Sequence, residues 1–236
     1  MSRRRCRYAV AVPLLVLAAG TLMAWLTSLD LRVAEYFYNA DRGGWPVGNI
    51  LPFALAYDYG QLLGFIPAIV ALVLLISGLW LRPFRPARRS AAFVLLMLVL
   101  GPGLLVNAVL KDNWGRPRPR QVEQFGGEYQ FRPAWLMGPS GEGRTSFPSG
   151  HAAIGFYFTF PYFILLAKNR RAARAWLWGG IALGVFIGTA RMAKGAHWPS
   201  DILWSFGVVY FTGYGLARAL GLDDEPDASG NEARAT

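Results

Sequence analysis

Cysteine, histidine and acidic side chains are scarce in this chain of 236 residues, which contains one Cys, two His and 14 Asp or Glu. Cys6 cannot form an internal disulfide and has no second thiol for a metal site. The segments between the apolar runs lack clustered carboxylates and hold only His151 and His197 as imidazoles. We therefore expect no metal site and no other cofactor.

Formal charge is also missing from three long stretches, Tyr8 to Leu29, Tyr59 to Leu81 and Ser90 to Leu110. Each is long enough to cross a membrane, because about 20 apolar helical residues span roughly 30 Å of hydrocarbon. Three shorter apolar runs further along reach that length only if flanking polar residues sit at the interface. We expect an all-α, six-transmembrane-helix bundle in a single domain of residues 1–222, with spans at about 8–29, 59–81, 90–110, 150–167, 175–191 and 200–220.

The first apolar stretch has an alternative interpretation, because the arginines at positions 3, 4, 5 and 7 are also typical of the basic start of a signal peptide. The stretch is long for a signal sequence, and no clear small-x-small cleavage site precedes Asp30. A retained membrane anchor is the preferred interpretation.

The net charge of +10 does not indicate a nucleic-acid partner, because the Lys and Arg residues fall between the apolar spans. Four cations lie in each of the N-terminus, residues 82–89 and residues 168–174. These segments share one side of the expected bundle, so the positive-inside rule places both termini in the cytoplasm. The acidic tail, residues 223–236, is expected to be disordered there.

The remaining loops are then periplasmic. The first, residues 30–58, contains an apolar and aromatic stretch, Val33 to Tyr38, that suits a short interfacial helix and has no assigned chemistry. The second, residues 111–151, carries six cations against the positive-inside rule. Positive charge of that density predicts a role beyond topology.

Three polar clusters, residues 111–119, 148–151 and 191–201, lie at the outer ends of the expected spans, and both histidines belong to them. An imidazole with a reference pKa of about 6.5 attacks when neutral and donates a proton when charged. His151 and His197 together therefore suit an acid and a nucleophile. Either one alone is equally well a packed or helix-capping residue.

The first histidine follows a predicted helix start. Residues 148–151, PSGH, form a turn into a helix whose free N–H groups and positive dipole end would face an anion. Taken alone, this is an ordinary N-cap. Lys111, Arg118 and Arg191 add the positive charge that a phosphate dianion and its transition state need.

The second histidine has a carboxylate four residues later. A helical turn there would bring Asp201 to His197, holding one ring nitrogen protonated and leaving the other free to attack. In the alternative interpretation, Asp201 only caps a helix, and Arg191 and Lys194 only anchor the chain to lipid head groups.

Three motifs, in order and spacing, make up a signature: Lys111, six residues, Arg118-Pro119; then residues 148–151; then Arg191, five residues, His197, three residues, Asp201. This signature resembles that of the type-2 phosphatidic acid phosphatase superfamily. The resemblance covers about residues 90–220, and the six expected spans agree with its bacterial membrane members.

The resemblance implies a helical bundle that hydrolyses a phosphate ester without a metal. It implies that His197 is the nucleophile, that Asp201 orients it, and that His151 protonates the leaving alcohol. The implied phosphate-binding residues are Lys111, Arg118, Ser149, Gly150 and Arg191. One departure stands out, because the family commonly has Ser before the third-motif Arg, whereas this chain has Ala190.

The second outer loop adds Arg116, Arg120 and Arg144, which are expected to contact a lipid head group beyond the phosphate. Arg116 and Arg120 equally suit contacts with neighbouring anionic lipids. No residue pattern here predicts an oligomeric state.

The resemblance implies a membrane lipid phosphate as substrate, bound at the periplasmic face of a bacterial inner membrane. The candidates are lipid A phosphate, undecaprenyl diphosphate, phosphatidylglycerol phosphate and phosphatidic acid, with lipid A favoured by family-level similarity. Two rivals are considered. A vanadium-dependent haloperoxidase shares the signature but is usually soluble, and a transporter would place its charges mid-span rather than at span ends.

Overall fold

The computed structural model describes residues 3–139 and 143–222, whose regular structure is helical apart from two isolated β-bridges. The α-helices are α1 (Arg3–Leu26), α2 (Leu29–Phe37), α3 (Phe53–Tyr59), α4 (Phe65–Trp80), α5 (Arg88–Leu98), α6 (Asp112–Trp114), α7 (Gly150–Tyr157), α8 (Phe160–Leu165), α9 (Arg170–Ala193) and α10 (Pro199–Ala219). The 3-10 helices are η1 (Ala40–Arg42), η2 (Pro46–Asn49), η3 (Gly60–Gly64), η4 (Arg82–Ala87), η6 (Pro119–Gln121) and η7 (Glu123–Phe125), and η5 (Val99–Lys111) is a π-helix.

Four helical stretches of the described chain are long and apolar enough to cross a membrane: Arg7–Leu26, Phe53–Trp80, Arg82–Gln121 and Arg170–Ala193. The prediction of an all-helical chain with membrane-spanning helices is therefore confirmed. The number six is not, since two of the expected spans are missing from this set.

The expected span over 150–167 is two short helices, α7 and α8, because α7 ends at Tyr157 and α8 begins at Phe160. Pro161 lies in the first turn of α8 and has no N–H to donate to the carbonyl four residues earlier, so a continuous helix would lose a hydrogen bond there. The expected last span is continuous as α10, which has 21 residues. It is not among the four apolar stretches, and it carries Ser200, Asp201 and Ser205 in its first two turns and Arg218 in its last.

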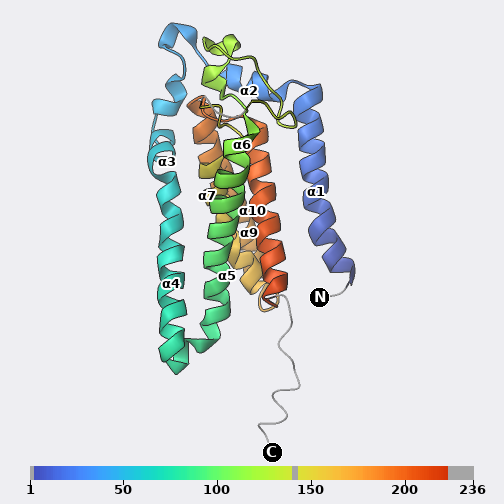
Figure 1. Cartoon of the computed structure of the whole chain (residues 1–236), viewed down its shortest axis with the longest axis vertical. Coiled ribbons are helices and arrows are strands. Elements are labelled where there is room, and N and C mark those ends of the chain that lie inside the picture. Colours follow the sequence, from blue (N-terminus) through green and yellow to red (C-terminus); the bar gives the residue numbers. More distant parts are fainter. Residues whose placement is uncertain (1–2, 140–142, 223–236) are drawn as a thin grey trace, which may run out of the picture.

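The helices pack closely around α7, which lies among α5, α9 and α10 in the centre of the bundle (Figure 1). Gly155 and Gly184 allow α7 and α9 to touch, because a Cβ on Gly155 would lie 2.6 Å from the Cα of Gly184. Small residues at helix contacts are typical of membrane bundles. Phe93, Met97 and Tyr157 fill the neighbouring core and are fully buried.

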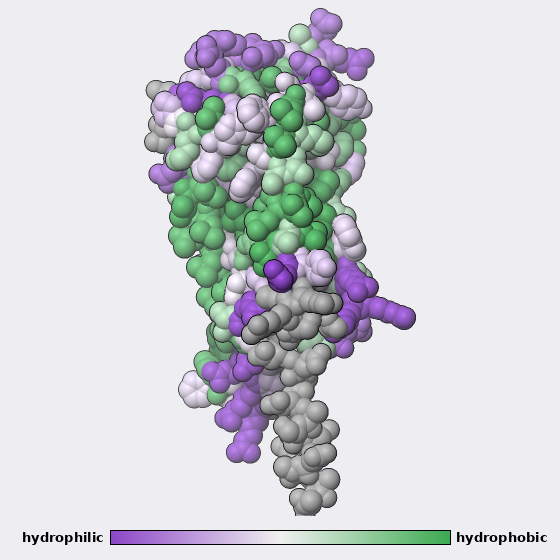
Figure 2. Space-filling view, turned by 90° about the vertical axis from the view of Figure 1, so that its right-hand side faces the viewer, coloured by the Kyte–Doolittle hydropathy of each residue, from purple (hydrophilic) through white to green (hydrophobic). Residues whose placement is uncertain are grey.

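The two ends of the bundle differ. The helix α1 begins and α10 ends at the lower end in Figure 1, where η4 and the start of α9 also lie. Figure 2 shows an apolar band between hydrophilic ends on the face that it presents. The polar clusters of the sequence lie at the opposite, upper end, together with α2 and α6.

The expected helix over Val33 to Tyr38 is present as α2, which begins earlier, at Leu29, and ends at Phe37, with Tyr38 as its extended C-cap. Asp30, in the first turn of α2, is buried, with 2% of its surface exposed. The expected acidic tail, residues 223–236, lies outside the described residues.

Candidate active site

The three polar clusters meet at one end of the bundle. Lys111 ends η5, His151 is the second residue of α7, and Arg191 lies in the last turn of α9. Lys111, Arg191 and His197 all interact electrostatically with His151. The bundle therefore brings both histidines and the signature cations together, although they are far apart in sequence.

The second histidine and its carboxylate form a buried pair. His197 Nδ1 lies 3.4 Å from Asp201 Oδ2, and both side chains are fully buried. This contact is longer than a normal hydrogen bond. Asp201 Oδ2 accepts shorter bonds from Ser146 Oγ at 2.6 Å and from the Trp198 N–H at 2.9 Å. The carboxylate is thus held in place with one oxygen directed at the imidazole.

The environment of His197 favours the neutral imidazole. Burial lowers the pKa of His197 from 6.5 to about 4. Asp201 partly opposes this effect, whereas the charges of Arg191 and Lys111 add to it. At neutral pH the ring therefore keeps a lone pair, and because Nδ1 faces Asp201, Nε2 is the nitrogen free to attack.

Several buried nitrogen atoms of the site lack a hydrogen-bond partner within the described part of the chain. They are both ring nitrogens of His197 and the Nε atoms of Arg118 and Arg191. Leaving a buried polar group unpaired costs about 1–3 kcal/mol. Unpaired nitrogens of two guanidinium groups and of one imidazole indicate that an anionic ligand completes the site.

Ser149 is the N-cap of α7, and its Oγ accepts a 3.4 Å bond from the Ala152 N–H. The Ser149 N–H donates to Ser205 Oγ at 2.9 Å, so both of these groups are already paired. Gly150 packs against Asn107, because a Cβ there would lie 2.5 Å from Asn107 Oδ1. Only glycine fits at position 150 without movement of Asn107. The first turn of α7, with the positive end of its dipole, includes His151.

Tyr57 of α3 is a site residue that the sequence did not reveal. Its ring stacks on His151, with ring centroids 6.4 Å apart and an interplanar angle of 22°. The guanidinium carbon of Arg191 lies 3.8 Å from the centre of the same ring, within the range of a cation–π contact. Tyr57 lies in the segment 30–58, outside every motif, and no spacing in the sequence connects it to the histidines.

The three expected head-group arginines have different surroundings. Arg116 is fully buried, and its guanidinium binds Asp30, Ser200 and Asp201, so its expected head-group contact is wrong. Arg120 is exposed, and its side chain acts electrostatically on Tyr57. Arg144 is half-buried, with its guanidinium 5.1 Å from the centre of the Tyr129 ring. Arg120 and Arg144 stay predicted head-group contacts.

Ala190, where the family commonly has Ser, is fully buried one residue before Arg191. In the described ranges, 3–139 and 143–222, no three His, Cys, Asp or Glu side chains are grouped as a metal site. The cations whose charges act on His151 are Arg191, Lys111 and Arg118.

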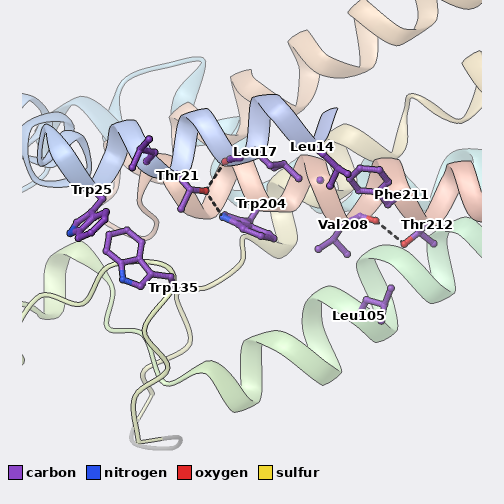
Figure 3. Close-up of a pocket in the computed structure, with 13 residues that line it drawn as sticks. Leu14, Leu17, Thr21, Trp25, Leu105, Trp135, Trp204, Val208, Phe211 and Thr212 are labelled. Atoms are coloured by element: carbon purple, nitrogen blue, oxygen red, sulfur yellow. Dashed lines mark hydrogen bonds between the residues drawn. The ribbon is translucent and has the colours of Figure 1, made fainter. Parts of the chain in front are cut away.

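Apolar cavities lie among the helices of the described chain, and two of them differ in size and in their distance from the signature residues. The larger, about 990 Å³, lies between α1 and α10 and includes Trp25, Trp135 and Trp204 (Figure 3). None of the signature residues lines it. The smaller, about 520 Å³, is lined by Asn107, Ala108 and Ile154, each within four residues of Lys111 or His151. The smaller cavity therefore adjoins the candidate active site, and so does a third of about 940 Å³, whose lining includes Met192 and Ile202, the sequence neighbours of Arg191 and Asp201.

Comparison with known families agrees with these motifs. A family model described as the PAP2 superfamily matches residues 90–222. That range contains every residue of the three-part signature.

Curated relatives extend the similarity over most of the chain. A lipid A 4'-phosphatase of Francisella tularensis subsp. novicida is 31% identical over 186 residues, 78% of this chain and 83% of the relative. A lipid A 4'-phosphatase of Rhizobium leguminosarum is 33% identical over 177 residues, covering 72% and 73% of the two chains. A lipid A 1-phosphatase of Rhizobium johnstonii is 34% identical over 127 residues, covering 53% and 46%. No solved structure matches the chain significantly.

Proposed function

Because this chain belongs to the PAP2 superfamily, we propose that it removes the 4'-phosphate of lipid A at the periplasmic face of a bacterial inner membrane. The family and the curated relatives support a lipid phosphatase. The particular lipid, the membrane face and the mechanism are the proposal.

The main support for this proposal is the set of unpaired buried nitrogens in the site. His197 presents Nε2, because its Nδ1 faces Asp201, and Arg118 and Arg191 each present an Nε. A phosphoryl group has the oxygens to accept from both guanidinium groups while its phosphorus faces the imidazole. The charges of Arg191 and Lys111 already act on His197 in the ligand-free site.

In the first step, His197 Nε2 attacks phosphorus, a nitrogen–phosphorus bond forms, and the bond from phosphorus to the lipid oxygen breaks. Without substrate, burial and the charge of Arg191 lower the pKa of His151 to about 3. The negative charge of the bound phosphate raises this pKa, so that His151 carries a proton, gives it to that oxygen, and the lipid leaves as an alcohol. Asp201 stabilises the positive charge that develops on the His197 ring. Lys111, Arg118 and Arg191 stabilise the extra negative charge on the phosphoryl oxygens.

In the second step, water attacks the phosphohistidine. His151 takes up a proton from the water, the nitrogen–phosphorus bond breaks, and inorganic phosphate leaves with His197 restored. Arginine and lysine supply the charge that a metal ion supplies in other phosphatases, so we propose that the reaction needs no added metal.

The smaller cavity suits one acyl chain of the substrate. Its apolar lining includes Ala108 and Ile154, one helical turn from Lys111 and His151. A lipid lying there would place its phosphate at the site while its hydrocarbon remains in the bilayer. Lipid A fits this arrangement because its phosphates are attached to a sugar backbone that carries the acyl chains.

The proposed membrane face follows from the distribution of charge. The basic segments 82–89 and 168–174 lie at the end of the bundle opposite the site (Figure 1). By the positive-inside rule, that end is cytoplasmic and the site is periplasmic. Both termini would then be cytoplasmic, with residues 1–222 forming one membrane domain.

The test is a phosphate-release assay with protein purified in detergent and EDTA. Lipid A, undecaprenyl diphosphate, phosphatidylglycerol phosphate and phosphatidic acid are supplied separately to wild type, His197→Ala and Tyr36→Ala. Tyr36 is 81% exposed on α2 and serves as the matched control. We expect lipid A to give the highest rate, His197→Ala to lose it, and Tyr36→Ala to keep it.

A quench experiment tests the mechanism. Wild type should yield an acid-labile, base-stable phosphoprotein, and His197→Ala should yield none. Activity only with added divalent metal would contradict the proposed chemistry. Vanadate-dependent halide oxidation without phosphate release would favour a haloperoxidase instead.

A further inference from the structure

A second charged cluster lies behind the nucleophile, on the side of Asp201 away from His197. Arg116 is at its centre and is fully buried. Its Nη1 donates to Asp201 Oδ1 at 2.5 Å and to Ser200 Oγ at 2.9 Å. Its Nη2 donates to Asp30 Oδ2 at 2.7 Å, and its Nε donates to the Arg132 carbonyl at 2.8 Å. All three guanidinium nitrogens are therefore used inside the protein.

The other carboxylate of the cluster comes from the first outer loop. Asp30, in the first turn of α2, is 2% exposed. Its Oδ1 accepts from the Ser200 N–H at 3.0 Å, and its Oδ2 accepts from Ser200 Oγ at 2.6 Å as well as from Arg116. Asp30 thus ties α2 to the start of α10, one residue before Asp201.

The cluster is rigid. The aromatic rings of Phe131 and Trp198 flank the Arg116 guanidinium, with its central carbon 5.8 and 5.4 Å from their centroids. Trp198 is itself fixed, because its Nε1–H donates to the Pro117 carbonyl at 2.9 Å. A guanidinium held by two rings and by two carboxylates has no freedom to follow a substrate.

The charges of the cluster reach the nucleophile through Asp201. One cation, Arg116, and two carboxylates, Asp30 and Asp201, leave a net charge of one negative. The other charged or titratable groups that act on His197 are Arg191 and Lys111, while His151 interacts with it across the site. Negative charge behind the imidazole stabilises the positive charge that it acquires during attack on phosphorus.

We propose that Arg116 and Asp30 are positioning residues for the His197–Asp201 pair, connecting the first outer loop to the nucleophile and setting the net charge behind it. This inference rests on the proposed function, because it assigns a purpose to the orientation of Asp201. Arg116 fixes Oδ1, so that only Oδ2 is left to face the imidazole. Asp30 balances Arg116, so that Asp201 keeps its negative character toward His197.

The test compares four variants that change the charge of the cluster: Asp30→Asn, Arg116→Gln, Arg116→Lys and the double variant Asp30→Asn/Arg116→Gln. Two exposed residues of α2 provide matched controls, Glu35→Gln and Arg32→Met. The assay is the pH dependence of kcat and KM for phosphate release from lipid A. Thermal unfolding in detergent is measured on every variant, so that a loss of folding is seen separately.

Asp30→Asn should lower kcat by about 10- to 100-fold, which is the size of effect known for residues that orient a functional histidine without touching the substrate. KM should stay within about twofold. Its acid limb should not rise. Arg116→Gln should move the acid limb of kcat/KM upward by about one pH unit, because two carboxylates then lack their shared cation. The double variant restores a net charge of one negative, so its acid limb should return toward that of wild type. Arg116→Lys keeps the positive charge, so the acid limb of its kcat/KM profile should stay at the wild-type pH.

The cluster would have only a structural role if two results were found together. The acid limbs of all four variants would coincide, and their rates would fall only as far as their unfolding temperatures do. Wild-type kcat in Asp30→Asn would have the same consequence. Failure of the proposed function is distinguishable, because in that case wild type itself releases no phosphate from any of the four lipids or His197→Ala remains active.

Discussion

Gly150 stands where the backbone of α7 meets η5, and its replacement by alanine tests how closely the site depends on that contact. The new Cβ would lie 2.5 Å from Asn107 Oδ1, with the rest of the amide group 3.2 to 3.3 Å away. Asn107 cannot simply turn aside, because its Nδ2 donates to the Pro102 carbonyl at 2.7 Å. Either this bond breaks or the start of α7 moves.

The expected cost combines two effects. Overpacking costs about 1–3 kcal/mol, and a lost hydrogen bond about 0.5–1.5 kcal/mol. The higher helix propensity of alanine returns up to about 1 kcal/mol. With the full offset we expect a net loss of about 0.5–3.5 kcal/mol in the free energy of unfolding, or roughly 1–14 °C in Tm. Activity should fall further, by about 10- to 100-fold, because His151 follows Gly150 directly and catalysis is sensitive to small displacements.

The assay measures Tm and phosphate release for Gly150→Ala, Asn107→Ala and the double variant. Removing the Asn107 amide makes room for the new methyl group, so the double variant should recover part of the activity that Gly150→Ala loses. Gly179→Ala on α9 is the matched control, because no atom lies within 4 Å of its added Cβ. Wild-type activity in Gly150→Ala, or a double variant that is the sum of its two single losses, would refute the reasoning.

Three further predictions concern the catalytic groups. His197→Ala should lower phosphate release by at least about a thousandfold, as loss of a catalytic nucleophile does, and measurable turnover at the wild-type rate would contradict its role. Because the pKa of His197 is lowered to about 4, kcat/KM should stay high until the pH falls through about 4, where the imidazole gains a proton. The free energy of unfolding should rise as the pH increases from about 4 to 6.5, because in this range the unfolded chain binds a proton at His197 that the folded chain does not. An acid limb of kcat/KM near pH 6.5 would contradict a buried His197. Tyr57→Ala should lower kcat by roughly tenfold through loss of the ring between His151 and Arg191, whereas Tyr57→Phe keeps the stacking and should retain most of the rate; equal losses in both would point to the hydroxyl instead.

The division of the fourth expected span into α7 and α8 is a feature that the sequence pattern does not predict. An apolar run over 152–167 has the composition of one helix, and Pro161 alone does not say whether the helix kinks or divides. The structure divides it near Phe158 and Thr159, where the chain passes closely against Gly180 of α9. That contact involves residues more than 20 positions apart, so a local pattern does not contain it.

The arginines of the second outer loop make the same point for the site. Arg116 and Arg118 are two residues apart in a single basic motif, and composition treats them alike. In the fold, Arg118 keeps an unpaired Nε at the site, while Arg116 turns inward to Asp30 and Asp201. Which of two neighbouring cations faces the ligand depends on where the distant carboxylates lie.

The sequence by itself determined the membrane-spanning character, the two histidines and the signature cations, because long uncharged runs and motif spacing are local properties. Only the tertiary structure decided that Tyr57 stacks on His151 and that Asp30 pairs with Arg116. These partners are separated by more than 80 residues and belong to elements that meet only when the bundle packs. Side-chain packing and burial select such contacts, and no spacing along the chain encodes them.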